Sequence, residues 1–245
     1  MSECALRFRG VAKSFGRVAA LADFTLEVPA GGAFGLVGEN GAGKTTLIKC
    51  LLDFCDVDAG SIEIFGVRHR LTAARARLAF VPERFNPPFY LTGRDFLQYL
   101  ARLHRVPYDE SRVEAVFNAL DLDPSALNRP ARTYSKGMTQ KLALAACLLS
   151  NKELYVLDEP TSGLDPKARA LFKREVKRLR AARRTIFLTS HSLTDMAEVC
   201  DRMAVVHQGR LRFAGAPAEL VRRFDARDIE QAFLACIAAA PTAVA

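Results

Sequence analysis

A glycine-rich segment, GLVGENGAGKTTLIKCLL, contains the residue types that bind phosphate groups. Its glycines allow backbone N–H groups to wrap around phosphate oxygens, and the helix that follows directs the positive end of its dipole at them. The Lys44 amine can reach terminal phosphates, and the Thr45 hydroxyl can bind Mg²⁺. An apolar strand before the loop and an amphipathic helix after it distinguish the segment from a chance glycine-rich turn. The segment predicts a nucleotide site built from Gly38, Glu39, Asn40, Gly41, Ala42, Gly43, Lys44, Thr45 and Thr46.

Two acidic residues follow a short apolar run in the segment ELYVLDEP. The run predicts a buried strand that ends at Asp158 and Glu159. Asp158 is then placed to hold Mg²⁺, directly or through water, and Glu159 to polarise an attacking water molecule. Without a phosphate loop in the same chain, these acids would indicate only a strand that ends in a charged turn.

A histidine, His191, follows the apolar run TIFLTS, which predicts another strand. A lone histidine is usually structural. At the carboxyl edge of a parallel sheet that binds phosphate, however, His191 is placed to contact a γ-phosphate.

The segment TYSKGMTQKLALAACLL predicts a helix with an unusual beginning. Ser135 can cap the helix, but Gly137 near its first turn lowers helix propensity. The glycine would allow a ligand to approach the backbone closely, and an anion suits a helix N-terminus. The alternative is a poorly formed helix cap.

These residues need a scaffold in which strands and helices alternate. Short β-like runs come first, a helical stretch follows from about residue 86 to 150, and strands then return with basic helices between them. Such alternation predicts an α/β fold with a mostly parallel sheet. We expect residues 1–245 to form a single domain, into which the helical stretch is inserted as a subdomain.

Composition narrows the class of protein. Half of the 245 residues are hydrophobic, which favours a sizeable core over disorder. No apolar run approaches the roughly 20 residues needed to span a bilayer, and no signal peptide is evident at the beginning. Six scattered cysteines indicate reduced thiols and argue against a zinc site.

The net charge of +8 favours an anionic partner, and the densest basic run is KARALFKREVKRLRAARR. Leu171, Phe172, Val176 and Leu179 form an apolar stripe in this run. The basic residues therefore belong first to the solvated face of an amphipathic helix. Contact with anionic headgroups or nucleic acid remains the alternative.

Taken together, the motifs and their order resemble the ATP-binding cassette family of transport ATPases. The resemblance extends from the strand that holds Phe15 to the strands around Gln208. It implies that Phe15 stacks on adenine, that GENGAGKT is the Walker A loop and LYVLDE the Walker B strand. Glu159 is then the catalytic glutamate, His191 the switch histidine, and SGLD, which ends at Asp165, a loop that crosses a dimer interface.

The segment YSKGMTQK occupies the place of the family signature, usually LSGGQ. In this family two cassettes face each other head to tail. The resemblance implies that Ser135 and Gly137 bind the γ-phosphate held by the Walker A loop of the other subunit.

Two features depart from the usual family pattern. Lys136 and Met138 replace a glycine and a glutamine of the signature, and Glu83 stands where a glutamine is usual. Both features are similar to those of an exporter-type (ABC-2) branch with separate permease subunits. A carboxylate at position 83 can still orient water near Mg²⁺ while altering metal affinity.

The resemblance further implies a P-loop NTPase core with a small antiparallel β subdomain and an inserted helical subdomain. We expect ATP and Mg²⁺ as ligands, the metal held by Thr45, Asp158 and Glu83. The expected partners are a second cassette, as a homodimer, and separate transmembrane permease subunits at the cytoplasmic face of the membrane. The catalytic set is Glu159, His191, Lys44 and Glu83, and no direct contact with nucleic acid is expected.

Two questions stay open at this level. The loop from Glu83 to Tyr90, with RFNPPFY, either docks the permease or packs the hinge of the helical subdomain. The alternative functions are a soluble cassette ATPase that acts on nucleic acid or the ribosome, and a regulatory cassette that binds ATP only. A cassette that only binds ATP is disfavoured because Glu159, Lys44 and His191 are intact. The sequence does not indicate which substrate is transported, because in this family the permease holds the substrate site.

Overall fold

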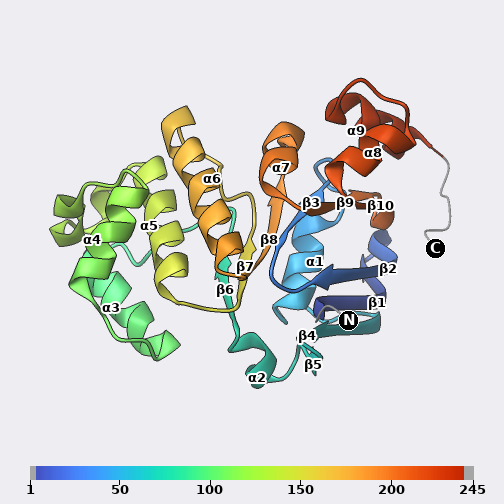
Figure 1. Ribbon diagram of the computed structural model, residues 1–245. Helices are drawn as coiled ribbons and strands as arrows, with labels where there is room; N and C mark the ends of the chain where they lie inside the picture. The colour runs from blue at the N-terminus through green and yellow to red at the C-terminus, as the bar shows by residue number, and fades with distance from the viewer. Residues whose placement is uncertain (1–3, 240–245) are drawn as a thin grey trace.

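Two β-sheets and the helices around them build the molecule in this computed structural model, which describes residues 4–239 (Figure 1). The smaller sheet is antiparallel, with strand order β2-β1-β4-β5. Its strands are β1 (Cys4–Phe15), β2 (Val18–Pro29), β4 (Ala59–Ile64) and β5 (Val67–Arg68). In β2, buried Phe24, Leu26 and Val28 alternate with exposed residues, the pattern of a sheet with one face on the core.

The larger sheet has the strand order β10-β9-β3-β8-β7-β6, and all its pairs are parallel except β9–β10. Its strands are β3 (Ala33–Val37), β6 (Leu78–Val81), β7 (Leu154–Leu157), β8 (Thr185–Ser190), β9 (Arg202–His207) and β10 (Arg210–Gly215). Every residue of β3, β7 and β8 is buried, as expected for strands covered on both faces. The α/β fold with a mostly parallel sheet and a small antiparallel one is thereby confirmed.

Helices follow many of the strands along the chain. They are α1 (Lys44–Leu51), α2 (Thr72–Arg75), α3 (Gly93–His104), α4 (Glu110–Ala119), α5 (Lys136–Leu149), α6 (Pro166–Ala181), α7 (Leu193–Val199), α8 (Pro217–Arg223) and α9 (Ile229–Ala238). Two 3₁₀ turns, η1 (Pro124–Asn128) and η2 (Ala131–Thr133), precede α5. Within residues 4–239, no helix has both the length and the apolar character needed to cross a membrane.

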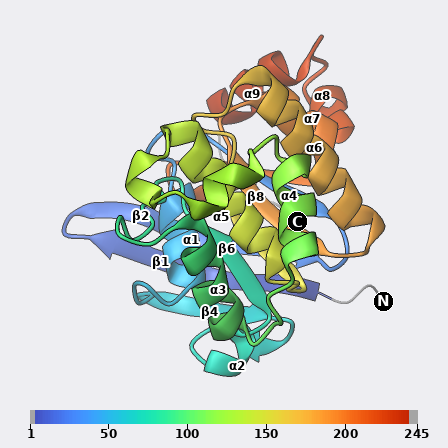
Figure 2. The same ribbon diagram turned by 90° about the vertical axis from the view of Figure 1, so that its left-hand side faces the viewer.

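Helices α3, α4 and α5 lie at one end of the molecule and face the viewer in Figure 2. In the chain they fall between β6 and β7, in the range for which the sequence predicts a helical subdomain. Local signals begin these helices: Thr92 and Asp95 form a capping box on α3, and Asp109 caps α4. The signature segment thus reaches the parallel sheet through α5, which contacts β6.

Phenylalanine rings join the two sheets. The Phe8 ring lies 6.0 Å from Phe24 in the antiparallel sheet and 6.4 Å from Phe187 in β8. Phe187 in turn stacks on Phe34 of β3 at 6.2 Å. All four side chains are buried, and burying one such ring contributes about 1.5–3 kcal/mol. The antiparallel sheet is therefore fixed against the strand that carries the phosphate loop.

Intramolecular ion pairs account for much of the charge on the basic helix α6. Lys173 contacts Asp195 at 2.5 Å and Glu198 at 2.7 Å, and Lys177 contacts Glu198 at 3.0 Å. The apolar stripe of the same helix points inward, with Phe172, Val176 and Leu179 buried. This arrangement is the amphipathic surface helix that the sequence predicts first.

Candidate functional site

The predicted chemistry gathers at one edge of the parallel sheet. Because β3, β6, β7 and β8 run parallel, the segments after their carboxyl ends meet there. They surround a pocket of about 380 Å³. Its lining consists of Val18, Ala19, Ala20, Glu39, Asn40, Gly41, Ala42, Gly43, Lys44, Thr45, Thr46, Glu83, Asp158, Glu159, Ser162 and His191.

The phosphate loop connects β3 to α1, and its backbone angles and close contacts require glycine at several positions. Gly41 and Gly43 have φ angles of 81° and 109°, a region that favours glycine. A Cβ atom on Gly38 would lie 2.4 Å from the Val206 carbonyl oxygen, which no side chain could tolerate. The loop therefore keeps its backbone exposed to the pocket while its rear face packs against β9.

The Lys44 side chain is held inside the loop. Its amine donates to the carbonyl oxygens of Gly38 at 2.6 Å and Glu39 at 3.2 Å. Burial lowers the pKa of Lys44, while the negative charges of Glu159, Asp158 and Glu83 act in the opposite direction. The amine thus lies in a partly desolvated position where its attraction for a phosphate is strong.

Asp158 lies 3% exposed at the end of β7, where Thr189 holds it. The Thr189 hydroxyl donates to Asp158 Oδ1 at 2.7 Å. Burial raises the pKa of Asp158, and the hydrogen bonds from Thr189 and Thr45 oppose that rise. A carboxylate beside a threonine hydroxyl is an oxygen-donor set that suits Mg²⁺, which takes few protein ligands and completes its shell with phosphate and water.

Glu159 is directed toward His191 by its backbone. It adopts a φ of 47°, and its N–H donates to the Thr189 hydroxyl at 2.9 Å. Its Oε2 then lies 2.9 Å from His191 Nδ1. The Glu159 side chain is 14% exposed and that of His191 is 73% exposed. Glu159 is therefore the more buried partner, and His191 the one closer to solvent.

Glu83 follows β6 and also lines this pocket. Its negative charge contributes to the raised pKa of Asp158, which places the two carboxylates close enough to interact. A site with three carboxylates around one lysine favours a cationic ligand near Asp158. Glu83 therefore interacts electrostatically with Asp158, the residue directly after β7.

Phe15 ends β1 and is 53% exposed. It is not among the residues that line the pocket, but the following β-hairpin supplies Val18, Ala19 and Ala20 to the wall. The Lys13 amine lies 5.4 Å from the centre of the Phe15 ring. The ring is therefore exposed on the hairpin that borders the phosphate loop.

We expect Phe15→Ala to raise the KM for ATP more than it lowers kcat. The resemblance implies that this ring stacks on adenine. A ring so placed would contribute contact area to ground and transition states alike, and its loss would remove uniform binding. Because stacking carries little base specificity, the wild-type chain should also accept GTP. Steady-state kinetics with both nucleotides measure this, and an unchanged nucleotide affinity would assign the stacking role to another residue.

The signature residues lie outside the pocket. Ser135 caps α5 by accepting from Met138 N–H at 3.2 Å. A Cβ on Gly137 would lie 3.3 Å from the Gly163 carbonyl oxygen, so the helix start packs on the SGLD loop. That loop ends at Asp165, which caps α6 by accepting from Ala168 N–H at 2.8 Å. Ser135, Gly137 and Asp165 thus lie near one another at the starts of α5 and α6, and none of them lines the pocket that holds the phosphate loop.

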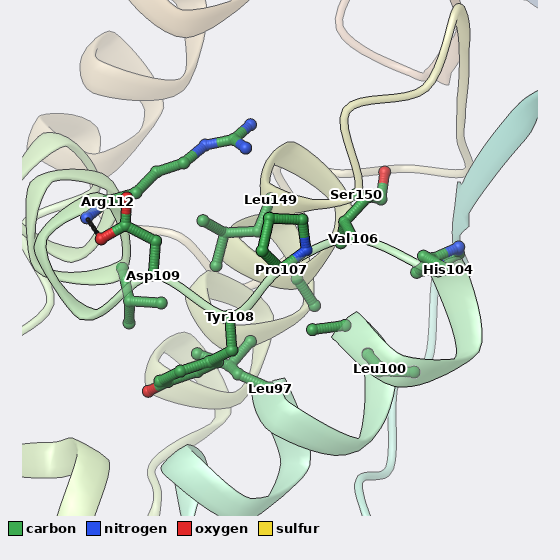
Figure 3. Close-up of a pocket in the computed structure, with 13 residues that line it drawn as sticks. Leu97, Leu100, His104, Val106, Pro107, Tyr108, Asp109, Arg112, Leu149 and Ser150 are labelled. Carbon is green, nitrogen blue, oxygen red and sulfur yellow. Dashed lines mark hydrogen bonds between the residues drawn. The ribbon is translucent and has the colours of Figure 1, made fainter.

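A second pocket lies among α3, α4 and α5 (Figure 3). Its lining is mostly apolar, with Leu97, Leu100, Pro107 and Leu149 around it. The cavity measures about 20 Å³, which is room for about one water molecule. It is therefore too small for a nucleotide, and the phosphate-loop pocket holds the chemistry.

Sequence reasoning did not identify several residues of the site. Thr189 bridges Asp158 and the Glu159 backbone, and its only signal is its place two residues before His191. The hairpin residues Val18 to Ala20 line the pocket without any motif of their own, and Ser162, the first residue of SGLD, lines it although the family resemblance implies only a dimer-interface role for that segment. Among residues 4–239, all six cysteines are free and no group of three or more His, Cys, Asp or Glu side chains is arranged for a metal.

Comparison with known proteins agrees with this geometry. A protein family described as ABC transporter matches residues 21–162. The Nod factor export ATP-binding protein I of Paraburkholderia xenovorans is 35% identical over 90% of this chain and 74% of its own length. An uncharacterized ABC transporter ATP-binding protein of Nostoc is 36% identical over 84% of this chain, which spans 62% of that relative.

Two solved structures extend the likeness to three dimensions. A structure of the ATP binding subunit of an ABC transporter has a TM-score of 0.88 at 27% identity and covers 95% of this chain and 99% of its own. A bacterial Atm1-family ABC exporter with ATP bound has a TM-score of 0.78 at 26% identity, covering 90% of this chain and 40% of its own. The chain therefore belongs to the ATP-binding cassette (ABC) transporter family, whose ATP-binding subunits are ATPases that power transport.

Proposed function

We propose that two copies of this chain form a head-to-tail dimer on the cytoplasmic face of a membrane and hydrolyse ATP to drive export through separate permease subunits. The observation that carries the proposal is the division of the motifs. The phosphate loop, Asp158, Glu159 and His191 line one pocket, while Ser135 and Gly137 lie outside it. A partner in head-to-tail orientation would bring its own Ser135 and Gly137 to this pocket.

Each side chain of the pocket has a proposed task. Lys44 and the loop N–H groups bind the phosphates, and the Glu159 carboxylate accepts the proton of the attacking water. His191, held 2.9 Å from Glu159, orients that carboxylate and contacts the γ-phosphate. Thr45, Asp158 and Glu83 would hold Mg²⁺, which neutralises phosphate charge when bound.

ATP couples hydrolysis to movement because it favours the closed dimer. A ligand shifts a conformational equilibrium only through differential affinity for the two states. The γ-phosphate would touch one subunit in the open state and both in the closed state. Its release as free phosphate then removes the contacts that hold the dimer closed. Export is the favoured direction because several relatives carry the name Nod factor export ATP-binding protein.

The proposed permease contact is an apolar groove between the parallel sheet and α3. The groove measures about 430 Å³ and is lined by Phe54, Phe80, Phe85 and Phe96 among others. Phe85 is half-buried and its ring lies 5.5 Å from Phe96, so this part of the loop packs the hinge. Beyond it, Phe89 and Tyr90 are 68% and 69% exposed, as is Phe54 at 69%. We assign docking to these exposed rings and the hinge to Phe85.

Phe54→Ser and Phe89→Ser are each expected to reduce binding to the permease without reducing ATP binding. Both rings are exposed, so their removal costs the fold little. The measurement is co-purification of the chain with the permease from detergent-solubilised membranes. Leu234→Ser is the matched control, because Leu234 is 60% exposed on α9 at the opposite end of the molecule from α3. Equal loss in the control would contradict the assignment of the groove.

A further inference from the structure

The turn between β9 and β10 packs directly behind the phosphate loop. Gly209 N–H donates to the Ala42 carbonyl at 2.9 Å, and the Gly209 carbonyl accepts from Ala22 N–H at 3.0 Å. A Cβ on Gly43 would lie 3.5 Å from Gly209 Cα, and one on Gly38 would lie 2.4 Å from the Val206 carbonyl oxygen. The end of β9 therefore supports the loop at both ends.

Beside this support, a carboxylate of the loop meets a histidine of β9. His207 Nδ1 lies 3.3 Å from Glu39 Oε2. The Glu39 side chain is 56% exposed and that of His207 is 19% exposed, so the histidine is the more fixed partner. Glu39 also lines the nucleotide pocket, and its carbonyl oxygen accepts from the Lys44 amine.

Glu39 poses an electrostatic difficulty for the loop. It places a negative charge in a segment that receives the phosphates, and like charges in close proximity repel. Glu159, Asp158 and Glu83 are the acids whose charges act on the pKa of Lys44, and Glu39 is not among them. Within residues 4–239, His207 is the only basic side chain at ion-pair distance from the Glu39 carboxylate.

We propose that His207 is a positioning residue for nucleotide binding. It holds the Glu39 carboxylate against the β9–β10 turn and away from the phosphates, so that the loop presents its N–H groups to the nucleotide. This role depends on ATP binding at the phosphate loop and is independent of the proposed dimer and permease.

The test is a double-mutant cycle on ATP affinity, measured with the isolated chain by titration of a fluorescent ATP analogue. His207→Ala is expected to weaken binding by up to about fivefold, the upper end for loss of a partly exposed contact between side chains. The double variant His207→Ala/Glu39→Gln should recover the affinity, because no carboxylate remains to repel the phosphates. Glu39→Gln alone completes the cycle and should gain less affinity than the double variant recovers, because His207 already keeps the wild-type carboxylate away from the phosphates.

A matched control separates this role from a structural one. Glu114→Gln removes the same charge from an exposed position on α4, far from β9, and should not rescue His207→Ala. In steady-state assays His207→Ala should raise KM with little change in kcat, the mark of lost ground-state binding.

Two results would overturn the proposal: an unchanged ATP affinity in His207→Ala, or a loss that Glu39→Gln does not recover. If His207→Ala fails to fold, as judged by its thermal unfolding, His207→Asn makes the same comparison with a side chain that keeps a polar group at this position. Failure of the permease or dimer experiments would leave this cycle unaffected, because it uses the isolated chain and nucleotide alone.

Discussion

Glu159→Gln is expected to keep ATP binding while losing at least about 100-fold in turnover, the lower end of what a general base contributes. The amide has the shape of the carboxylate and can still meet His191, 2.9 Å from the native Oε2. It cannot accept a proton from water. The phosphate loop and Lys44 do not depend on this side chain, so nucleotide affinity should remain.

Two measurements check this expectation. Phosphate release gives the turnover, and size-exclusion chromatography with ATP should show the variant accumulating as a dimer, because the γ-phosphate persists. Glu114→Gln, the same exchange at an exposed position on α4, should hydrolyse ATP at the wild-type rate. Wild-type turnover in Glu159→Gln would remove this glutamate from the reaction.

The parts of the site that the sequence predicted are those whose signal is local. A phosphate loop needs glycine at particular positions, as the φ angles of 81° at Gly41 and 109° at Gly43 illustrate. Strands β7 and β8 are short apolar runs, and the polar residues directly after them reach the site because parallel strands end at one edge. Neither inference required knowledge of distant contacts.

The parts that the sequence did not predict depend on strand order. β3 lies between β9 and β8, so residues far apart in the chain become neighbours of the phosphate loop. The pairing of β8 with β7 brings Thr189 to Asp158, 31 residues apart, and the pairing of β9 with β3 brings His207 to Glu39, which are many more residues apart. A threonine or histidine in a strand carries no mark of such a contact. Tertiary placement alone gives these residues their part in the site.

The position of Ser135 leads to the second prediction with a large effect. Ser135 caps α5 outside the pocket of its own chain, whereas Lys44 lies inside that pocket. Ser135→Arg should therefore leave ATP binding to the monomer almost intact and block dimer closure, because a bulky cation replaces the hydroxyl. Lys44→Ala should weaken the chain's own nucleotide site and leave its signature surface unchanged. Each variant alone should lose about 100-fold or more of its activity, comparable to loss of one transition-state contact.

The cap itself requires a control. Loss of an N-cap costs about 0.5–2 kcal/mol of stability, so Ser135→Arg could act by loosening α5. Thr92→Arg removes an equivalent cap from α3. The Thr92 hydroxyl accepts from Asp95 N–H at 3.1 Å, and Thr92 lies outside the nucleotide pocket. If phosphate release survives in Thr92→Arg but not in Ser135→Arg, the loss belongs to the position of Ser135 and not to capping in general.

Mixing the two inactive variants distinguishes a site shared between subunits from one contained in a single chain. A heterodimer would hold one intact composite site, with Lys44 from the Ser135→Arg chain and Ser135 from the Lys44→Ala chain. Random pairing of equal amounts would restore about a quarter of the wild-type sites, since about half of the dimers are mixed and each has one good site of two. Activity should rise with protein concentration, because the heterodimer must assemble. If Ser135→Arg instead abolishes ATP binding to the monomer, or if the mixture stays inactive while both variants remain folded, the serine does not act across an interface.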